Sequence, residues 1–419
     1  MTAANLFPAL TKYCKLFKFF PKNPMQWDPK TRTFHFRTWR TGVSWYLYLT
    51  LVHSVYSFAM IYAIVQQLTG TGPRKSATKQ IVLYLLGFFN FCGTAVHLII
   101  AFEGKGVVNG CNSLLKIWVD VLLWRRKQGT KTFQQPNPPN TGHNTEKILM
   151  SAMVIMGEIA SYILAPSSII LRQDVLYPIV VMIAARLRLS RPTAILLHII
   201  RSIMVAVNIA EICLSIVILI LTFLVGLKVG NEVFAVLIEN SNSRPAQSQV
   251  TLYLIKIYHL LQITIKNVAP FQEVGTLTLL GFGMMLSTFA NYVTLRCYDL
   301  FPLPVYLFYP FISIIVGIVF YLVLPLTHSV TDDSVRLLRS FRIGLAAKGN
   351  GGCAGKFKGC EARVKKYMRR KIRSIQSLKL YAGIAGSKLF CMNKETKREW
   401  YEHGIDCTIN LLIARSEGM

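Results

Sequence analysis

Three ionisable side chains interrupt long apolar stretches of this sequence: His97, Glu158 and Glu211. An ionisable group inside a membrane-spanning helix is costly, so such residues commonly contact a ligand, an ion or a buried partner. Glu158 lies midway along its apolar stretch and is the first candidate for a ligand contact. The alternative for both carboxylates is a hydrogen bond within a helical bundle or hydration at an interface, and a single His near a span end is usually a satisfied partner.

A second polar group lies near the C-terminus, where Asp406, Thr408 and Asn410 interrupt a short apolar run. On a helix each two-residue step turns by about 200°, so the three side chains cannot all face one axis. If several copies of this helix surround an axis, Asp406 forms a carboxylate ring that attracts cations. The alternative is a tail that only packs on the protein or lies loose. At about 18 Å the run is shorter than a bilayer core of about 30 Å, so it needs protein around it.

The composition places these residues in a membrane protein. Hydrophobic residues make up 53% of the 419-residue chain and charged residues 16%, with a mean hydropathy of +0.41; soluble domains carry about 25% charged residues. The net charge of +28 comes from basic residues between the apolar runs, where they act as topology signals. No base-stacking aromatic pattern accompanies them, so we expect no nucleic-acid partner.

The residues that support cofactor or metal chemistry are scattered. The nine cysteines include no C-x-x-C pair, and this spacing indicates neither a disulfide framework nor a zinc site. We find no catalytic constellation either. The sequence therefore predicts no metal, no cofactor and no enzyme.

The apolar runs predict an all-α polytopic membrane bundle that forms a single domain over residues 1–419. We expect six spans, at residues 43–65, 81–102, 148–165, 202–227, 274–295 and 304–324. The third span is closed by Pro166, and the connection 103–147 joins the second to the third. A short apolar piece at residues 177–185, inside the ambiguous segment 172–201, is better interpreted as interfacial or re-entrant than as a span. Residues 250–266 continue the fifth helix outside the lipid.

The basic residues set the orientation. The N-terminal segment 1–40 and the segment 328–402 are rich in Lys and Arg, which the positive-inside rule places in the cytoplasm. The six-span bundle then covers residues 43–327, and residues 403–419 form the short last helix of a split seventh segment.

Aromatic residues in the outer halves of the spans are candidates for a ligand pocket, because such pockets are mostly apolar with a few placed polar groups. By this topology they include Phe308 in the sixth span. For each aromatic residue the alternative is plain packing or an interface belt. Our predicted ligand site consists of Glu158, Tyr162, Phe289, Tyr292, Tyr306 and Tyr309.

The layout resembles the arthropod gustatory and odorant receptor family, which are seven-span chemoreceptors with a cytoplasmic N-terminus. In that family the last element has a cytoplasmic half, a small-residue turn, and a pore-lining half ending in Thr-Tyr, five apolar residues and Gln-Phe. Residues 380–390, with Ala382, Gly383, Ala385 and Gly386, are similar to the first half, and residues 407–414 to the second. Thr408 matches the signature, whereas Ile409 replaces the Tyr and no Gln-Phe follows.

The resemblance implies a multi-pass plasma-membrane protein that is a tetrameric, non-selective cation channel, opened by a small tastant or odorant. It implies identical or related subunits around a pore that Thr408 lines, with Asp406 and Asn410 as the other pore candidates. Two alternatives stay open. A secondary transporter would show internal repeats, and a receptor-like partner subunit would bind without conducting.

Overall fold

The computed structural model describes residues 6–16, 23–70, 77–127, 142–170, 174–243, 248–301, 303–347, 358–384 and 386–414. The predicted turn residue Ala385 lies outside them. In chain order the elements are α1 (Phe7–Leu16), β1 (Met25–Asp28), β2 (Thr33–Phe36), α2 (Val43–Leu47), the π-helix η2 (Tyr48–His53), α3 (Ser54–Leu68), α4 (Ala77–Lys127), α5 (Gly142–Ile170), α6 (Leu176–Arg186), α7 (Arg191–Ser243), α8 (Ser248–Arg296), the 3-10 turn η3 (Tyr298–Leu300), α9 (Leu303–Tyr306), α10 (Phe308–Ala347), α11 (Lys358–Ser374), β3 (Tyr381–Ile384), β4 (Ser387–Cys391) and α12 (Lys394–Ala414).

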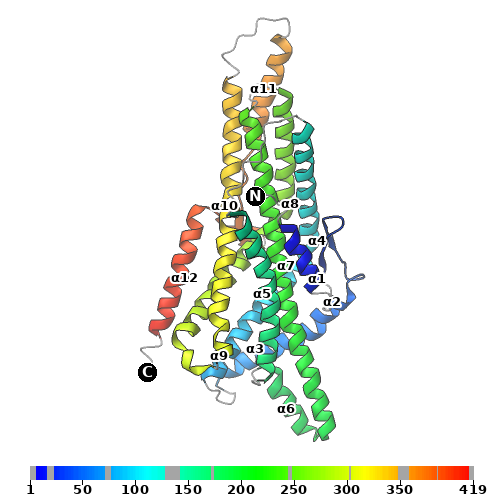
Figure 1. Cartoon of the computed structure of the whole chain (residues 1–419), viewed down its shortest axis with the longest axis vertical. Coiled ribbons are helices and arrows are strands. Elements are labelled where there is room, and N and C mark those ends of the chain that lie inside the picture. The colour runs from blue at the N-terminus through cyan, green and yellow to red at the C-terminus, as the bar shows by residue number, and fades with distance from the viewer. Residues whose placement is uncertain are drawn as a thin grey trace.

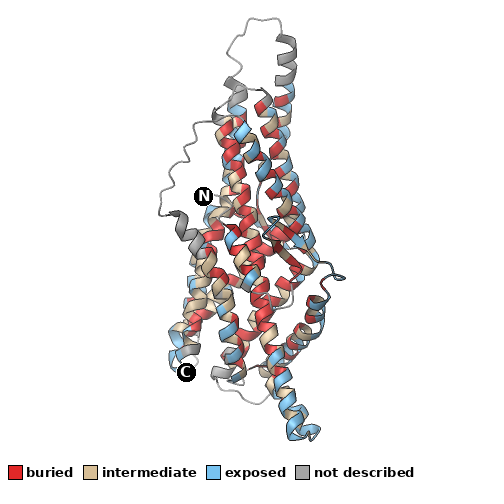
Figure 2. Ribbon diagram, turned by 45° about the vertical axis from the view of Figure 1, so that its right-hand side comes forward, coloured by how far each residue is buried: buried red, intermediate tan, exposed pale blue. Residues whose placement is uncertain are grey.

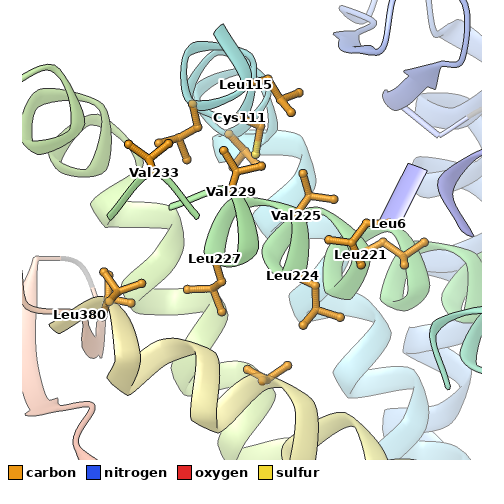
Figure 3. Close-up of a cluster of buried hydrophobic side chains, with 14 of the residues drawn as sticks. Leu6, Cys111, Leu115, Leu221, Leu224, Val225, Leu227, Val229, Val233 and Leu380 are labelled. Carbon is orange, nitrogen blue, oxygen red and sulfur yellow. The ribbon is translucent and has the colours of Figure 1, made fainter. Parts of the chain in front are cut away.

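The helix α7 forms the centre of an elongated bundle and runs along most of its length (Figure 1). Its most apolar stretch is 78% buried, as expected of a helix that is apolar on every face. Figure 3 shows Leu224 and Val225 of α7 within a cluster that includes Cys111 and Leu115 of α4 and Leu380 near β3. Helices α4, α5, α8 and α10 surround α7.

Within the described residues, six helices are long and apolar enough to cross a membrane. This confirms the predicted all-α polytopic bundle. They are Val43–Leu68, Leu83–Lys127, Met150–Ile170, Arg191–Ser241, Val250–Arg296 and Phe308–Ile343.

Most of these helices are longer than the predicted spans. Residues 103–127, predicted as part of a connection, continue α4, whose 51 residues extend about 77 Å. Hydropathy detects only the apolar part of a helix, which suits lipid. The polar continuation of α4 is stabilised by packing against other helices. Trp124 stacks on Tyr253 with ring centroids 4.7 Å apart, and Arg125 lies 3.1 Å from the Glu239 carboxylate. As predicted, residues 250–266 continue the fifth helix, α8.

Two further expectations concern α5 and α6. The third span was expected to close at Pro166, but α5 continues through this proline to Ile170, because neighbouring helices can satisfy the backbone group that a proline frees. The short apolar piece forms α6, which has 11 residues, too few to cross a bilayer. It packs on α7, and the tip formed by α6 and the first turns of α7 is largely exposed (Figure 2).

The C-terminal region differs from the prediction. Residues 380–390, expected as an anchor half, instead form most of the antiparallel β3–β4 hairpin, in which Gly386 takes a φ of +83° at the turn. The helix that precedes the hairpin in the chain is α11. The hairpin requires glycine at position 383, because the backbone there passes so close to the Ser387 carbonyl that a Cβ has no room.

The last helix begins at Lys394, earlier than the predicted residue 403, and has 21 residues. The prediction counted only apolar residues, whereas a capping box starts the helix before them. The Thr396 amide donates to Asn393 Oδ1 (2.9 Å) and the Asn393 amide donates to Thr396 Oγ1 (3.2 Å). At about 32 Å, α12 matches the thickness of a bilayer core.

The N-terminal segment forms a layer on the side of the bundle. The β1–β2 hairpin pairs Met25 with Phe36 and Asp28 with Thr33. The side chain of Asn112 on α4 fastens it: the Phe34 amide donates to Asn112 Oδ1, and Asn112 Nδ2 donates to the Phe34 carbonyl, both at 2.8 Å.

Replacing Asn112 tests this attachment. We expect Asn112→Ala to loosen the hairpin, because it leaves both backbone groups of Phe34 without partners at about 1–3 kcal/mol each. Hydrogen exchange of residues 25–36 should then be faster. The matched control is Ser113→Ala, since among the described residues the Ser113 hydroxyl bonds only to the Asn109 carbonyl of its own helix. Equal exchange in both variants would contradict the role of Asn112.

Candidate ligand cavity and last helix

An apolar cavity of about 200 Å³ lies between α4, α5, α7, α8 and α10. Its wall is rich in phenylalanine, and Phe88 and Phe282 meet edge to face with ring centroids 5.5 Å apart. The polar side-chain atoms in the wall come from Cys92, Cys213 and Thr278. A site of this chemistry accepts a small, mainly apolar molecule by dispersion and burial.

One wall of the cavity contacts the last helix. Phe320 of α10 lines the cavity and stacks on Trp400 of α12, with ring centroids 3.9 Å apart. Gly283 of α8 permits this position, because a Cβ there would collide with the Phe320 ring. The Trp400 indole donates to the Leu280 carbonyl (3.2 Å). The wall of the cavity is therefore in direct contact with α12.

The six predicted ligand residues do not line this cavity. Phe289, Tyr292, Tyr306 and Tyr309 belong to a neighbouring apolar cluster near α9. Tyr162 is 62% exposed. The remaining residue is the half-buried Glu158, which follows a glycine of the wall. A role of these six in ligand binding stays a prediction.

Most residues of the actual wall could not be recognised from the sequence. Of the aromatic residues that the prediction considered, Phe308 lines the cavity. Phe88, Phe89 and Phe282 were missed, because a phenylalanine inside a span has the same pattern whether it faces lipid, packs in the core or borders a cavity. The glycines at positions 157 and 283, which line the cavity, were the only feature of the sequence that could have indicated it.

His97 and Glu211 lie in a buried polar region between η2, α4 and α7. Both are fully buried, and neither side chain has a hydrogen-bond partner among the described residues. The His97 ring packs edge to face on His53, with centroids 4.7 Å apart. Glu211 is close to Tyr13 of α1: burial raises the pKa of the Tyr13 phenol well above its usual range, and the nearby carboxylate raises it further.

Asn208 of α7 connects this region. Its Oδ1 accepts a hydrogen bond from the Tyr48 hydroxyl (3.1 Å) and lies 2.8 Å from His53 Nδ1, and its Nδ2 donates to Asn90 Oδ1 (3.2 Å). His53 Nε2 lies 3.0 Å from the hydroxyl of Thr94. The π-helix η2 ends at His53, so the wide turn and the network coincide, as they often do at functional positions.

The three predicted pore residues lie on two faces of α12, with Thr408 opposite Asp406 and Asn410. Thr408 is 6% exposed, and its hydroxyl donates to the Gly404 carbonyl of the same helix (2.8 Å). Asp406 and Asn410 are exposed. This separation agrees with the turn of about 200° per two residues. The outward face also carries Ile405 and Ile409, which are 59% and 47% exposed.

Comparisons with known proteins bear on the whole chain. No protein-family profile matches it, and no curated protein matches its sequence. Among solved structures, the insect olfactory receptor OR5 from Machilis hrabei in complex with eugenol superposes with a TM-score of 0.56 and 10% sequence identity. A second structure of that receptor gives 0.53 and 9%. Both alignments cover 98% of this chain and 99% of the receptor.

The chain therefore has the fold of an insect-type chemoreceptor, a polytopic membrane protein. The predicted resemblance is confirmed at the level of the fold. The two matched structures, which align over their full length, are of an olfactory receptor and not of an enzyme.

The Asn208 network generates a stability prediction. We expect Asn208→Ala to lower the thermal unfolding temperature of the purified protein, because His53, Tyr48 and Asn90 each lose a buried partner worth about 1 kcal/mol. Asn109→Ala, at an exposed position of α4, is the control. An equal unfolding temperature for both variants would show that the network adds nothing to stability.

Proposed function

We propose that this chain is a chemosensory receptor of the plasma membrane and is itself a ligand-gated, non-selective cation channel. It assembles as a tetramer, with itself or with related subunits, and its N-terminus is cytoplasmic. The observation that carries the proposal is the outward face of α12, which exposes Asp406 and Asn410 beside apolar side chains.

This face is unsuited to lipid. An Asp near the middle of a lipid-facing helix costs about 3 kcal/mol, whereas at the axis of an assembly it faces water and cations. Helix α12 lies on the outside of the bundle (Figure 1), against α8 and α10. Copies of it can therefore meet around an axis with their isoleucines in contact. Because Thr408 faces its own bundle, the structure favours Asp406 and Asn410 as the pore-lining residues.

The apolar cavity is the proposed site of the ligand. Its phenylalanines suit a small, mainly apolar organic molecule, and the Thr278 hydroxyl offers a polar contact. The similar receptor from Machilis hrabei was solved with eugenol, which is a ligand of this kind. In our proposal the ligand displaces Phe320, and the stacked Trp400 transmits the displacement to α12.

The distribution of charge supports the proposed orientation. Basic residues gather where α4 ends, along α10 and on α11, including Arg125, Arg126, Arg339, Arg342 and Arg373. The positive-inside rule places this end of the bundle in the cytoplasm.

Electrophysiology tests the function. In cells that carry the chain at their surface, a panel of small apolar odorants and tastants should evoke a cation current. A chain that is at the surface and silent to the whole panel would count against a self-sufficient channel. Transport of a compound without any gated current would favour the secondary transporter.

A pair of α5 variants tests the cavity. Ala160 lines it, whereas the neighbouring Ile159 is 40% exposed and lies outside the wall. We expect Ala160→Phe to fill the cavity and raise the half-maximal ligand concentration at least about tenfold, which corresponds to about 1.4 kcal/mol. Ile159→Phe should leave the response near that of the native chain. If both respond alike, the ligand binds elsewhere.

The side of the C-terminus distinguishes the channel from a non-conducting partner subunit. We expect an epitope tag after residue 419 to be stained in intact cells, because α12 has the length to cross the bilayer. A tag that is stained only after permeabilisation would mean that α12 does not cross, and the chain would then lack a pore helix.

A further inference from the structure

A second, larger cleft of about 810 Å³ lies between α8, α10 and the segment 375–388 that leads from α11 into the β3–β4 hairpin. It shares no lining residue with the apolar cavity. The function proposed above does not use this cleft.

Basic side chains from separate elements converge on the cleft: Lys266 of α8, Arg339 and Arg342 of α10, Lys379 before β3 and Lys388 of β4. All five are exposed, and within the described part of the chain none of them forms an ion pair with a carboxylate. One acidic residue, the 5% exposed Glu273, lines the same cleft. Five cations therefore face one carboxylate.

The wall that brings the lysines here is held by hydrogen bonds. The Tyr258 hydroxyl donates to the Gln376 carbonyl (2.9 Å), the Leu378 amide donates to Ser334 Oγ (2.7 Å), and Gln272 Nε2 donates to the Tyr381 carbonyl (2.8 Å). These hydrogen bonds hold the segment that carries Lys379 and Lys388 against α8 and α10, which carry the other three cations. Basic residues that only orient a membrane protein need no such convergence. Like charges gathered in one cleft repel one another, and an anion that binds among them relieves this cost.

We propose that this cleft binds a polyvalent phosphate-bearing anion. The two arginines offer planar forks that match phosphate oxygens, and the three lysines add point charges around them. An inositol phosphate in solution and the headgroup of a phosphoinositide lipid carry the same chemistry. Because the segment 375–388 leads to α12, the bound anion would brace the connection between α11 and the last helix.

The test is a binding measurement on the purified full-length chain, and it does not depend on channel activity. One arm titrates inositol hexakisphosphate by calorimetry into protein in detergent. The other arm measures binding of protein in nanodiscs that contain phosphatidylinositol 4,5-bisphosphate or, for comparison, phosphatidylserine. We expect saturable binding in at least one arm; binding in the first assigns a soluble ligand, and binding only to the phosphoinositide assigns a lipid.

Two double variants with equal loss of charge locate the site. Arg339→Gln with Arg342→Gln should weaken binding at least about tenfold, since a hydrogen bond to a charged group contributes about 1.5–3 kcal/mol. Arg336→Gln with Arg373→Gln removes two exposed arginines that do not line the cleft, and should change the affinity less than about twofold.

A third variant changes the affinity in the opposite direction. Glu273→Gln removes the carboxylate of the cleft and should tighten binding several-fold. The proposal is overturned if no arm shows saturable binding, if both double variants lose affinity equally, or if Glu273→Gln leaves the affinity unchanged. Thermal unfolding of each variant confirms that it is folded.

Discussion

The packing of α7 against its neighbours on every side is the constraint on which this structure depends. Between helices in a bilayer the lipid is as apolar as the side chains, so close van der Waals contact drives association. Glycines make that contact here: Gly93 of α4 faces Ile212, and Gly157 of α5 faces Val217, each so closely that a Cβ would collide. The cavity lies beside this contact, because Gly157 and Val217 both line it.

A polar stripe fixes how α7 is rotated within the bundle. Asn208, Glu211 and Ser215 recur at helical spacing, so they share one face. Ser215 Oγ accepts a hydrogen bond from Asn23 Nδ2 (3.1 Å), and Asn208 joins η2 and α4. Apolar contacts alone would tolerate other rotations of so uniform a helix. The stripe thus ties the N-terminal layer to one orientation of the central helix.

Hydropathy was sufficient to predict six spans and the class of fold, because lipid imposes the same requirement on each span. It could not predict how far α4 and α10 continue, since polar turns of this kind are stabilised by neighbouring helices, as Trp124 of α4 is by Tyr253 of α8 and Arg125 by Glu239 of α7. The two hairpins were missed because strands of four or five residues leave little periodicity. For the site, helical geometry correctly separated Thr408 from Asp406. The cavity depends on which of many similar phenylalanines face inward, and that is set by tertiary packing.

The position of α12 at the end of the chain has a consequence for biosynthesis. Domains fold as the chain emerges, the N-terminal part first, so the surfaces of α8 and α10 that receive Trp400 exist before α12 is made. The last helix then adds itself to a completed bundle, with a face that no earlier segment covers. In the tetramer that we propose, other subunits would cover this face only after the single chain has folded.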